Sequence, residues 1–182
     1  VCGVKTVAVL TDPSGVVVPT DGGLAKRLKA LDSRIVRLLL GRFSGTVALA
    51  PDLVANFSET KPTVVFPGIL NADWRKAVEA AAPSSPRERF TVLYAGGLNR
   101  SYGVPLLVEA AAQLPDVDFV FLGKGDCVDV VAESGLDNVR YGGFVGPDEL
   151  LAHAMAADVL INTRPPTAAF AVASFPSKLI EY

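Results

Sequence analysis

Residues 90–103 read FTVLYAGGLNRSYG, and this stretch decides the fold class. An unbroken run of strand-forming residues from Phe90 stops at Gly96-Gly97, and a helical pattern begins at Val104. The order strand, glycine turn, helix is typical of a buried parallel strand. Glycines let main-chain N–H groups approach a ligand, and the dipole of the following helix favours an anion there. The stretch therefore predicts a phosphate or diphosphate site with Arg100 beside it, although an ordinary β–α turn with a surface arginine explains these residues equally well.

The composition of the 182 residues is that of a globular protein, since half of them are apolar. Lys and Arg number 17 against 19 Asp and Glu, and no block of like charge suggests nucleic acid as a partner. Cys2, Cys127 and His153 have no metal-ligand spacing, so we expect neither a metal site nor a cofactor. No apolar run has transmembrane length and the opening residues resemble a core strand, which predicts a cytoplasmic protein.

The first seventy residues alternate between strands and helices, which predicts a parallel sheet. Strand patterns at residues 5–10, 45–50 and 63–66 are separated by a helix that Asp21 could cap and by a short helix begun at Pro51-Asp52. The basic side of the first helix could contact an anionic membrane surface, although a solvated helix flank is the commoner explanation. The apolar stripe of this helix is Leu24, Leu28, Leu31, Ile35 and Leu38, and its basic residues are Lys26, Arg27, Lys29, Arg34 and Arg37.

A change of character over residues 71–89, which are polar, alanine-rich and then Pro/Ser-rich, favours a linker. We therefore predict two Rossmann-like α/β lobes, residues 1–70 and residues 90–182, with a ligand in the crevice between them at the carboxyl ends of the strands. Both chain ends interrupt a pattern, so we expect incomplete lobes in a fragment of a longer protein. In the second lobe, strands are predicted at 90–95, 118–122, 139–141 and 158–162, and helices at 104–113, 128–133 and 147–156.

Two short motifs in the second lobe have alternative explanations. The sequence GKGD at 123–126 is half of a dinucleotide fingerprint, but Val128 stands where the third glycine belongs, which argues against a nicotinamide or flavin site. Asp116-Val117-Asp118 matches a metal-holding pattern of some sugar-transferring enzymes. Because it precedes its strand and so lies at the amino end, we interpret it as a turn with an aspartate at the start of the strand.

The segment SFPSKLIE at 174–181 predicts a second phosphate-binding helix start. Pro176 suits the first turn of a helix and leaves the N–H groups of Ser177 and Lys178 free to meet a phosphate. Glu181, about one turn further on, could accept hydrogen bonds from the two hydroxyls of a ribose. A capped helix start with an exposed lysine and glutamate explains the same residues.

Taken together, these motifs resemble the donor-binding lobe of retaining glycosyltransferases of the GT-B architecture, family 4. The resemblance is specific because four segments agree with the family in order and spacing. A hinge strand is similar as well, and the earlier residues resemble the end of the acceptor lobe more loosely. The four segments are YAGGLNRSYGVPLLVEAAAQL (94–114), FVFLGKGD (119–126), NVRYGGFVGPDELLAHAMAADVLINT (138–163) and FPSKLIEY (175–182), and the hinge strand is VVFPGIL (64–70).

The resemblance implies roles for individual residues. The first glutamate of the family's paired-glutamate motif is Ala173 here, and Gly97 and Tyr102 replace a usual arginine and lysine, so Arg100 is the one cation left in the first turn. By the resemblance, Gly96, Gly97, Asn99 and Arg100 face the donor diphosphate, Gly123, Lys124, Gly143, Phe144 and Val145 border the base, Ser177 and Lys178 hold phosphate, and Glu181 binds the ribose.

The activity implied by the resemblance is sugar transfer, with retention, from a UDP- or GDP-linked sugar to an acceptor hydroxyl, in polysaccharide or glycolipid biosynthesis. Cations and helix amides would stabilise the leaving diphosphate, so no metal is required. The acceptor would be a carbohydrate or a lipid-linked molecule, the latter with peripheral contact at the inner membrane face. We expect the chain alone to be inactive, and its residues indicate no catalytic group. A nucleotide-sugar 2-epimerase and a non-catalytic nucleotide-binding module are the alternatives.

Overall fold

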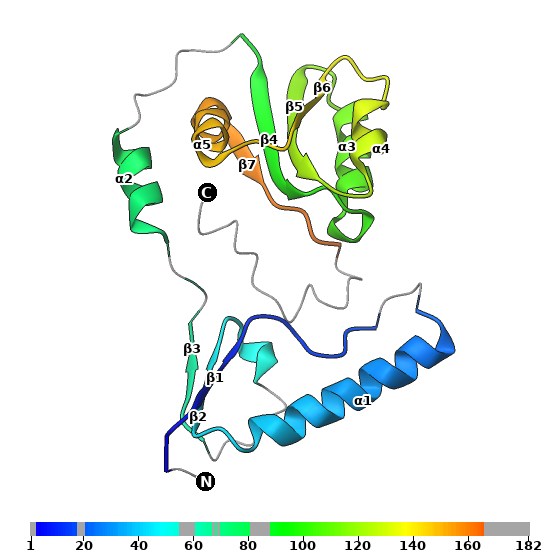
Figure 1. Ribbon diagram of the computed structural model, residues 1–182. Coiled ribbons are helices and arrows are strands. Elements are labelled where there is room, and N and C mark those ends of the chain that lie inside the picture. The colour runs from blue at the N-terminus through cyan, green and yellow to red at the C-terminus, as the bar shows by residue number, and fades with distance from the viewer. Residues whose placement is uncertain are drawn as a thin grey trace. The chain divides into compact units, whose positions relative to one another are not determined.

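The computed structural model describes residues 3–17, 21–54, 61–66, 68, 70–80 and 88–165. The described residues fall into two compact units, one up to residue 68 and the other from residue 70 to residue 165 (Figure 1). Each unit contains a parallel β-sheet, so the predicted α/β class with two Rossmann-like parallel sheets is confirmed. The positions of the two lobes relative to each other, and a crevice between them, stay predictions.

The first unit is a three-stranded parallel sheet in the order β1-β2-β3. The predicted strand–helix alternation is confirmed, with shorter strands than expected. A small core under the sheet consists of Ala48, Ala50 and Leu53. The elements are β1 (Val7–Leu10), α1 (Gly23–Leu40), β2 (Gly45–Ala48), the 3₁₀ turn η1 (Pro51–Leu53) and β3 (Thr63–Val65).

The beginning of α1 differs from the prediction. Gly22 is the N-cap residue, and the carboxylate of Asp21 forms an ion pair with Lys29 at 2.6 Å. The N-cap residue of this helix is therefore Gly22 and not Asp21, one residue later than predicted, and Asp21 pairs with a lysine two turns along the helix.

The apolar stripe of α1 is exposed. Its members range from 47% exposed for Ile35 to 73% for Leu24. The chain at Gly15 lies against Lys29 and Ser33, on another side of the helix, and is too close there to admit a side chain. Thus α1 contacts its unit through a mixed face and leaves its leucines outward.

The second unit contains a four-stranded parallel sheet in the order β6-β5-β4-β7. Three strands extend beyond their predicted ends into the glycines, since parallel pairing needs main-chain groups and no side chain. Residues 72–80, inside the predicted linker, form helix α2 and contact α5. The elements are α2 (Ala72–Ala80), β4 (Phe90–Gly97), the 3₁₀ turn η2 (Arg100–Tyr102), α3 (Val104–Ala112), β5 (Val117–Lys124), α4 (Val128–Ala132), β6 (Val139–Gly143), α5 (Pro147–Ala156) and β7 (Val159–Ile161).

Helices cover both faces of this sheet, as its continuous apolar strands predict. Alternate residues of β4 and β5 point to opposite faces: Tyr94 and Phe121 pack with α3 and α4, whereas Leu93 and Leu122 pack toward α5. Figure 1 shows α3 and α4 on one side of the sheet and α5 on the other. Both cores include residues of β4 and β5, the two strands that end at Gly97 and Lys124.

Membrane-spanning helices are absent from the described parts of the chain, where every helix is too short or too polar to cross a bilayer.

Candidate functional site

The predicted glycine segments lie next to one another at the carboxyl edge of the second sheet. In the parallel pairing of β4 with β5, Gly96 is opposite Gly123 and Gly97 is opposite Lys124. On the other side of β5, Gly143 is opposite Leu122 after a register shift. Three segments far apart in sequence therefore end side by side, as the strand–turn–helix pattern predicts.

Two of these glycines are required by the packing of the chain on itself. Gly123 has φ +139°, and a β-carbon there would overlap the carbonyl oxygen of Gly96. A β-carbon on Gly125 would overlap the carbonyl of Leu98. We predicted glycines for the approach of a ligand; at these positions they also let the loops after β4 and β5 touch each other.

The side chains of Asn99 and Asp126 join these two loops by reciprocal hydrogen bonds. The Arg100 N–H donates to Asp126 Oδ1 at 2.9 Å, and the Asp126 N–H donates to Asn99 Oδ1 at 3.3 Å. Two main-chain bonds add to them: Leu98 N–H to Lys124 O at 2.9 Å, and Cys127 N–H to Leu98 O at 2.8 Å. The turn that carries Arg100 is thereby tied to the loop after β5, while Arg100 itself is exposed.

Most main-chain N–H groups of this turn already have partners within the chain. Asn99 donates to Gly97, Tyr102 donates to Asn99, and Gly103 donates to Arg100. Together with the bonds from Leu98 and Arg100 described above, this leaves Ser101 as the residue of 98–103 whose main-chain N–H has no acceptor within the described part of the chain. An anion at this turn would therefore meet the Ser101 N–H and the Arg100 guanidinium rather than a row of free amides.

The ends of β5 and β6 present a cation over an aromatic ring. Lys124 Nζ lies 4.7 Å from the centroid of the Phe144 ring, which is a cation–π contact. Phe144 is 72% exposed, whereas Val145 packs toward the core beneath β4 and β5. The Tyr141 hydroxyl donates to the carbonyl of Gly123 at 3.0 Å and supports the same corner.

The chain reverses direction across the sheet between β4 and β7. From β4 it proceeds outward to β5 and β6, and then returns to β7 on the other side of β4. The loops that follow β4 and β7 meet there: the Thr163 hydroxyl donates to the Tyr102 carbonyl at 2.6 Å, and Pro165 lies against Gly103. Open α/β sheets bind ligands at such a switch point, outside the carboxyl ends of the strands.

Two titratable groups at this edge are shifted in opposite directions. The pKa of Asp126 is lowered, chiefly by the hydrogen bond from the Arg100 N–H, then by the Cys127 thiol, with Coulombic attraction from Arg100 adding to these. The pKa of Cys127 is raised, chiefly by burial and then by its contact with Asp126. Asp126 is therefore a carboxylate at neutral pH, and Cys127 is a protonated thiol.

Several predicted site residues fall outside the described residues. Ser177, Lys178 and Glu181, together with Ala173, all lie in 166–182, so their roles stay predictions.

Other candidates lie elsewhere in this unit. Asp118 pairs with Arg89 at 3.1 Å at the start of β5, where the sequence predicted a turn rather than a metal site. In the described ranges, no cluster of His, Cys, Asp and Glu side chains could hold a metal ion.

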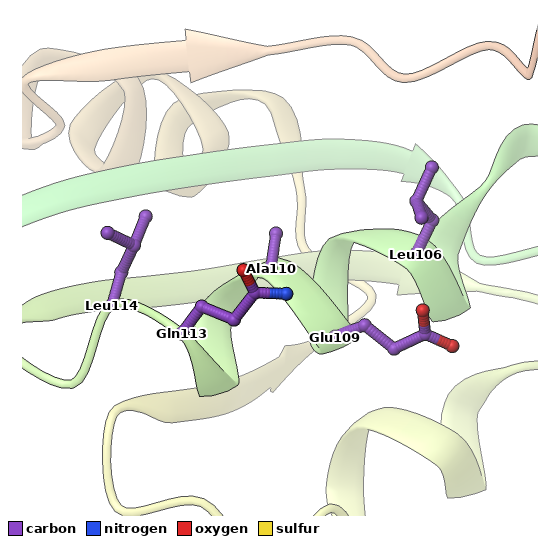
Figure 2. Close-up of a pocket in the computed structure, with 5 residues that line it drawn as sticks. All are labelled: Leu106, Glu109, Ala110, Gln113 and Leu114. Carbon is purple, nitrogen blue, oxygen red and sulfur yellow. The ribbon is translucent and has the colours of Figure 1, made fainter.

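A shallow hollow runs along α3 and has an exposed leucine at each end (Figure 2). It includes none of the residues predicted for the donor site. It is lined by Leu106, Glu109, Ala110, Gln113 and Leu114.

The sequence analysis did not assign site roles to Asp126, Ser101 or Thr163. Asp126 stands at the end of GKGD, directly before a helix, and an aspartate in that place often accepts main-chain hydrogen bonds. Nothing in the sequence paired Thr163 with Tyr102, because 61 residues separate them.

Comparisons with known proteins agree with this architecture. The structure is similar to sucrose-phosphate synthase from Thermosynechococcus elongatus, with a TM-score of 0.61 and 20% sequence identity over 92% of this chain and 48% of that one. The pneumococcal O-GlcNAc transferase GtfA, solved in complex with UDP and GlcNAc, gives a TM-score of 0.49 and 14% identity over 78% and 30% of the two chains. No protein-family model matches the sequence, and a search of curated proteins finds no match.

The first of these similarities shows a shared fold, that of GT-B glycosyltransferases. The chain spans about half the length of that synthase.

Proposed function

We infer that the carboxyl edge of the second unit binds the diphosphate of a nucleotide sugar, and that the chain belongs to a retaining family 4 glycosyltransferase. The observation that carries this inference is the meeting of the loops after β4 and β7 at the switch point, with Arg100 exposed on the first of them. The GT-B fold and the family resemblance of residues 94–163 support the same conclusion.

The chemistry proposed for this edge is electrostatic. As the glycosidic bond to the diphosphate breaks, negative charge builds on the leaving phosphate and positive charge on the sugar ring. The Arg100 guanidinium and the Ser101 N–H would stabilise the leaving group, together with Lys178. The exposed ring of Phe144 offers a flat apolar surface to a base, and Lys124 covers one of its faces. The donor would be a UDP- or GDP-linked sugar, and the acceptor a hydroxyl of a carbohydrate or of a lipid-linked molecule.

Saturation-transfer NMR tests the donor site directly. UDP-glucose and GDP-mannose are each mixed with the protein, and NADH serves as the dinucleotide control. We expect saturation of base and ribose protons for one of the two sugar nucleotides, weakened by Arg100→Ala, and none for NADH. Equal saturation for all three ligands, or for none of them, would contradict the assignment.

Product analysis separates the three alternatives, and because we expect the chain alone to be inactive, it is carried out on the full-length protein with donor and acceptor present. Anomeric proton signals distinguish a sugar transferred with retention, a donor epimerised at C2 and a donor left unchanged. The first result supports the transferase, the second the epimerase, and the third a binding module, for which Ala173 in place of the first motif glutamate is the sequence argument.

We propose that the peripheral membrane contact is made by α1. Its leucine stripe is exposed, and five basic side chains share the helix with a single acidic one, Asp32. Apolar residues beside lysine and arginine are the combination that binds anionic lipid surfaces. In co-sedimentation we expect binding to phosphatidylglycerol vesicles, little to phosphatidylcholine vesicles, and loss of binding in Leu31→Glu. If the protein stays in the supernatant with both lipids, this contact does not exist.

A further inference from the structure

We propose that Asp126 is a positioning residue: with Asn99 it forms a clasp that fixes the main chain of Arg100, so that the guanidinium is held ready for a diphosphate. This rests on the proposed function for the identity of the ligand. The clasp itself consists of the two reciprocal bonds, Arg100 N–H to Asp126 Oδ1 and Asp126 N–H to Asn99 Oδ1.

The geometry distinguishes a clasp from an ordinary turn. Each side chain accepts a hydrogen bond from the main chain of the other loop, so neither loop can move without breaking both bonds. The carboxylate also accepts a contact from the buried thiol of Cys127 at 3.3 Å, which anchors it to the core. A β-carbon on Gly125 would overlap the carbonyl of Leu98, so the loops can approach closely only with glycine at that position.

The position of the carboxylate also says which groups a ligand can use. Because Asp126 accepts the Arg100 N–H, a phosphate cannot take that amide without displacing the carboxylate. A fixed negative charge beside an anion site costs affinity by repulsion. The clasp favours binding only if the order that it imposes on Arg100 contributes more affinity than this repulsion removes.

The direction in which Asp126→Ala changes the affinity for an anion shows whether repulsion by the carboxylate or its ordering of Arg100 dominates. If Asp126 acted only as a like charge, or only as a competitor for the amide, Asp126→Ala would tighten the binding of an anion. The clasp predicts the opposite, a loss of affinity of about fivefold for UDP and for inorganic pyrophosphate. Asp126→Asn keeps an acceptor oxygen at the same place, so it should retain most of the affinity.

Calorimetry with UDP and with pyrophosphate measures this in four proteins: wild type, Asp126→Ala, Arg100→Ala and the double variant. If Asp126 acts through Arg100, its substitution causes no further loss of affinity once Arg100 is alanine, and the removal of its negative charge can only raise the affinity slightly. Asp129→Ala is the matched control, because it removes an exposed carboxylate three residues away, and it should leave affinity unchanged or slightly higher. Tighter binding in Asp126→Ala, or an equal loss in both backgrounds, would overturn the proposal.

Amide hydrogen exchange keeps this test separate from the proposed function. Asp126→Ala should speed exchange at the Arg100 N–H about tenfold, as expected when a charge-assisted hydrogen bond is lost. If wild type bound neither UDP nor pyrophosphate, the donor site would be refuted, and unchanged exchange would refute the clasp by itself.

Discussion

Asn138 offers the sharpest test of how the second unit is held together. It is 7% exposed, and its side-chain N–H₂ group donates to the carbonyls of Ala111 at 3.0 Å, Leu114 at 2.9 Å and Val117 at 2.9 Å. These carbonyls lie at the end of α3, in the following turn and at the start of β5. One amide therefore ties a helix end and a strand start to the beginning of β6.

The cost of losing this amide follows from the number of groups it satisfies. The two donor hydrogens of this amide are shared among three carbonyls and contribute about 1 kcal/mol each. The carbonyls of Ala111 and Leu114 also accept main-chain N–H groups, so neither is left without a partner. Asn138→Leu should therefore destabilise the unit by about 2 kcal/mol, which corresponds to a fall in melting temperature of about 10 °C for a unit of this size. Asn138→Asp should cost at least as much, since a carboxylate of the same shape would face three carbonyl oxygens.

Urea unfolding followed by circular dichroism measures the difference. Gln113→Ala is the control, because that exposed amide at the end of the same helix forms no side-chain hydrogen bond within the described part of the chain, and it should change stability by less than about 0.5 kcal/mol. If Asn138→Leu unfolded within that same margin of wild type, the three bonds would not contribute as the structure implies.

Three further results are expected. Gly123→Ala should destabilise by about 3 kcal/mol in urea unfolding, because a β-carbon would overlap the Gly96 carbonyl. Gly135→Ala, also at positive φ but with open space around it, should cost about 1 kcal/mol. Equal costs would contradict the close approach of β4 and β5. Phe121→Ala should cost about 4 kcal/mol in the same assay, since Phe121 is fully buried against Tyr94, and a cost under about 1 kcal/mol would mean that the core is packed differently. In a Cys2→Ser background, Cys127 should react with Ellman's reagent only on unfolding, and fast reaction in the native protein would show that the thiol is accessible. The free energy of unfolding should fall as pH rises past 9.0, because the pKa of Cys127 is raised in the folded protein and the unfolded thiol loses its proton first.

The sequence predicted the elements of the second unit well because its signals are local. Continuous apolar runs at Phe90 and Phe119 fixed two central strands, and the glycines after them fixed where the chain turns. Contacts between loops have no such signal: the pairing of Asn99 with Asp126 becomes visible only when parallel strands bring the two turns together. The same limit explains Asp21, where an ion pair with Lys29 replaced the expected cap.

The first unit shows another limit of pattern reading. The leucine spacing of α1 predicted the helix, yet the spacing alone does not say which face the rest of the unit covers. In the structure the chain at Gly15 occupies the side of Lys29 and Ser33, and the leucines are left exposed.

Calorimetric titration with UDP, GDP and ADP tests the central claim most directly. We predict that at least one of these nucleotides binds, and that Arg100→Ala and Lys178→Ala each weaken its affinity about tenfold or more. Arg89→Ala, which removes the same charge from the amino end of β4, should have no effect. Unchanged affinity in both Arg100→Ala and Lys178→Ala would contradict a diphosphate site at this edge of the sheet.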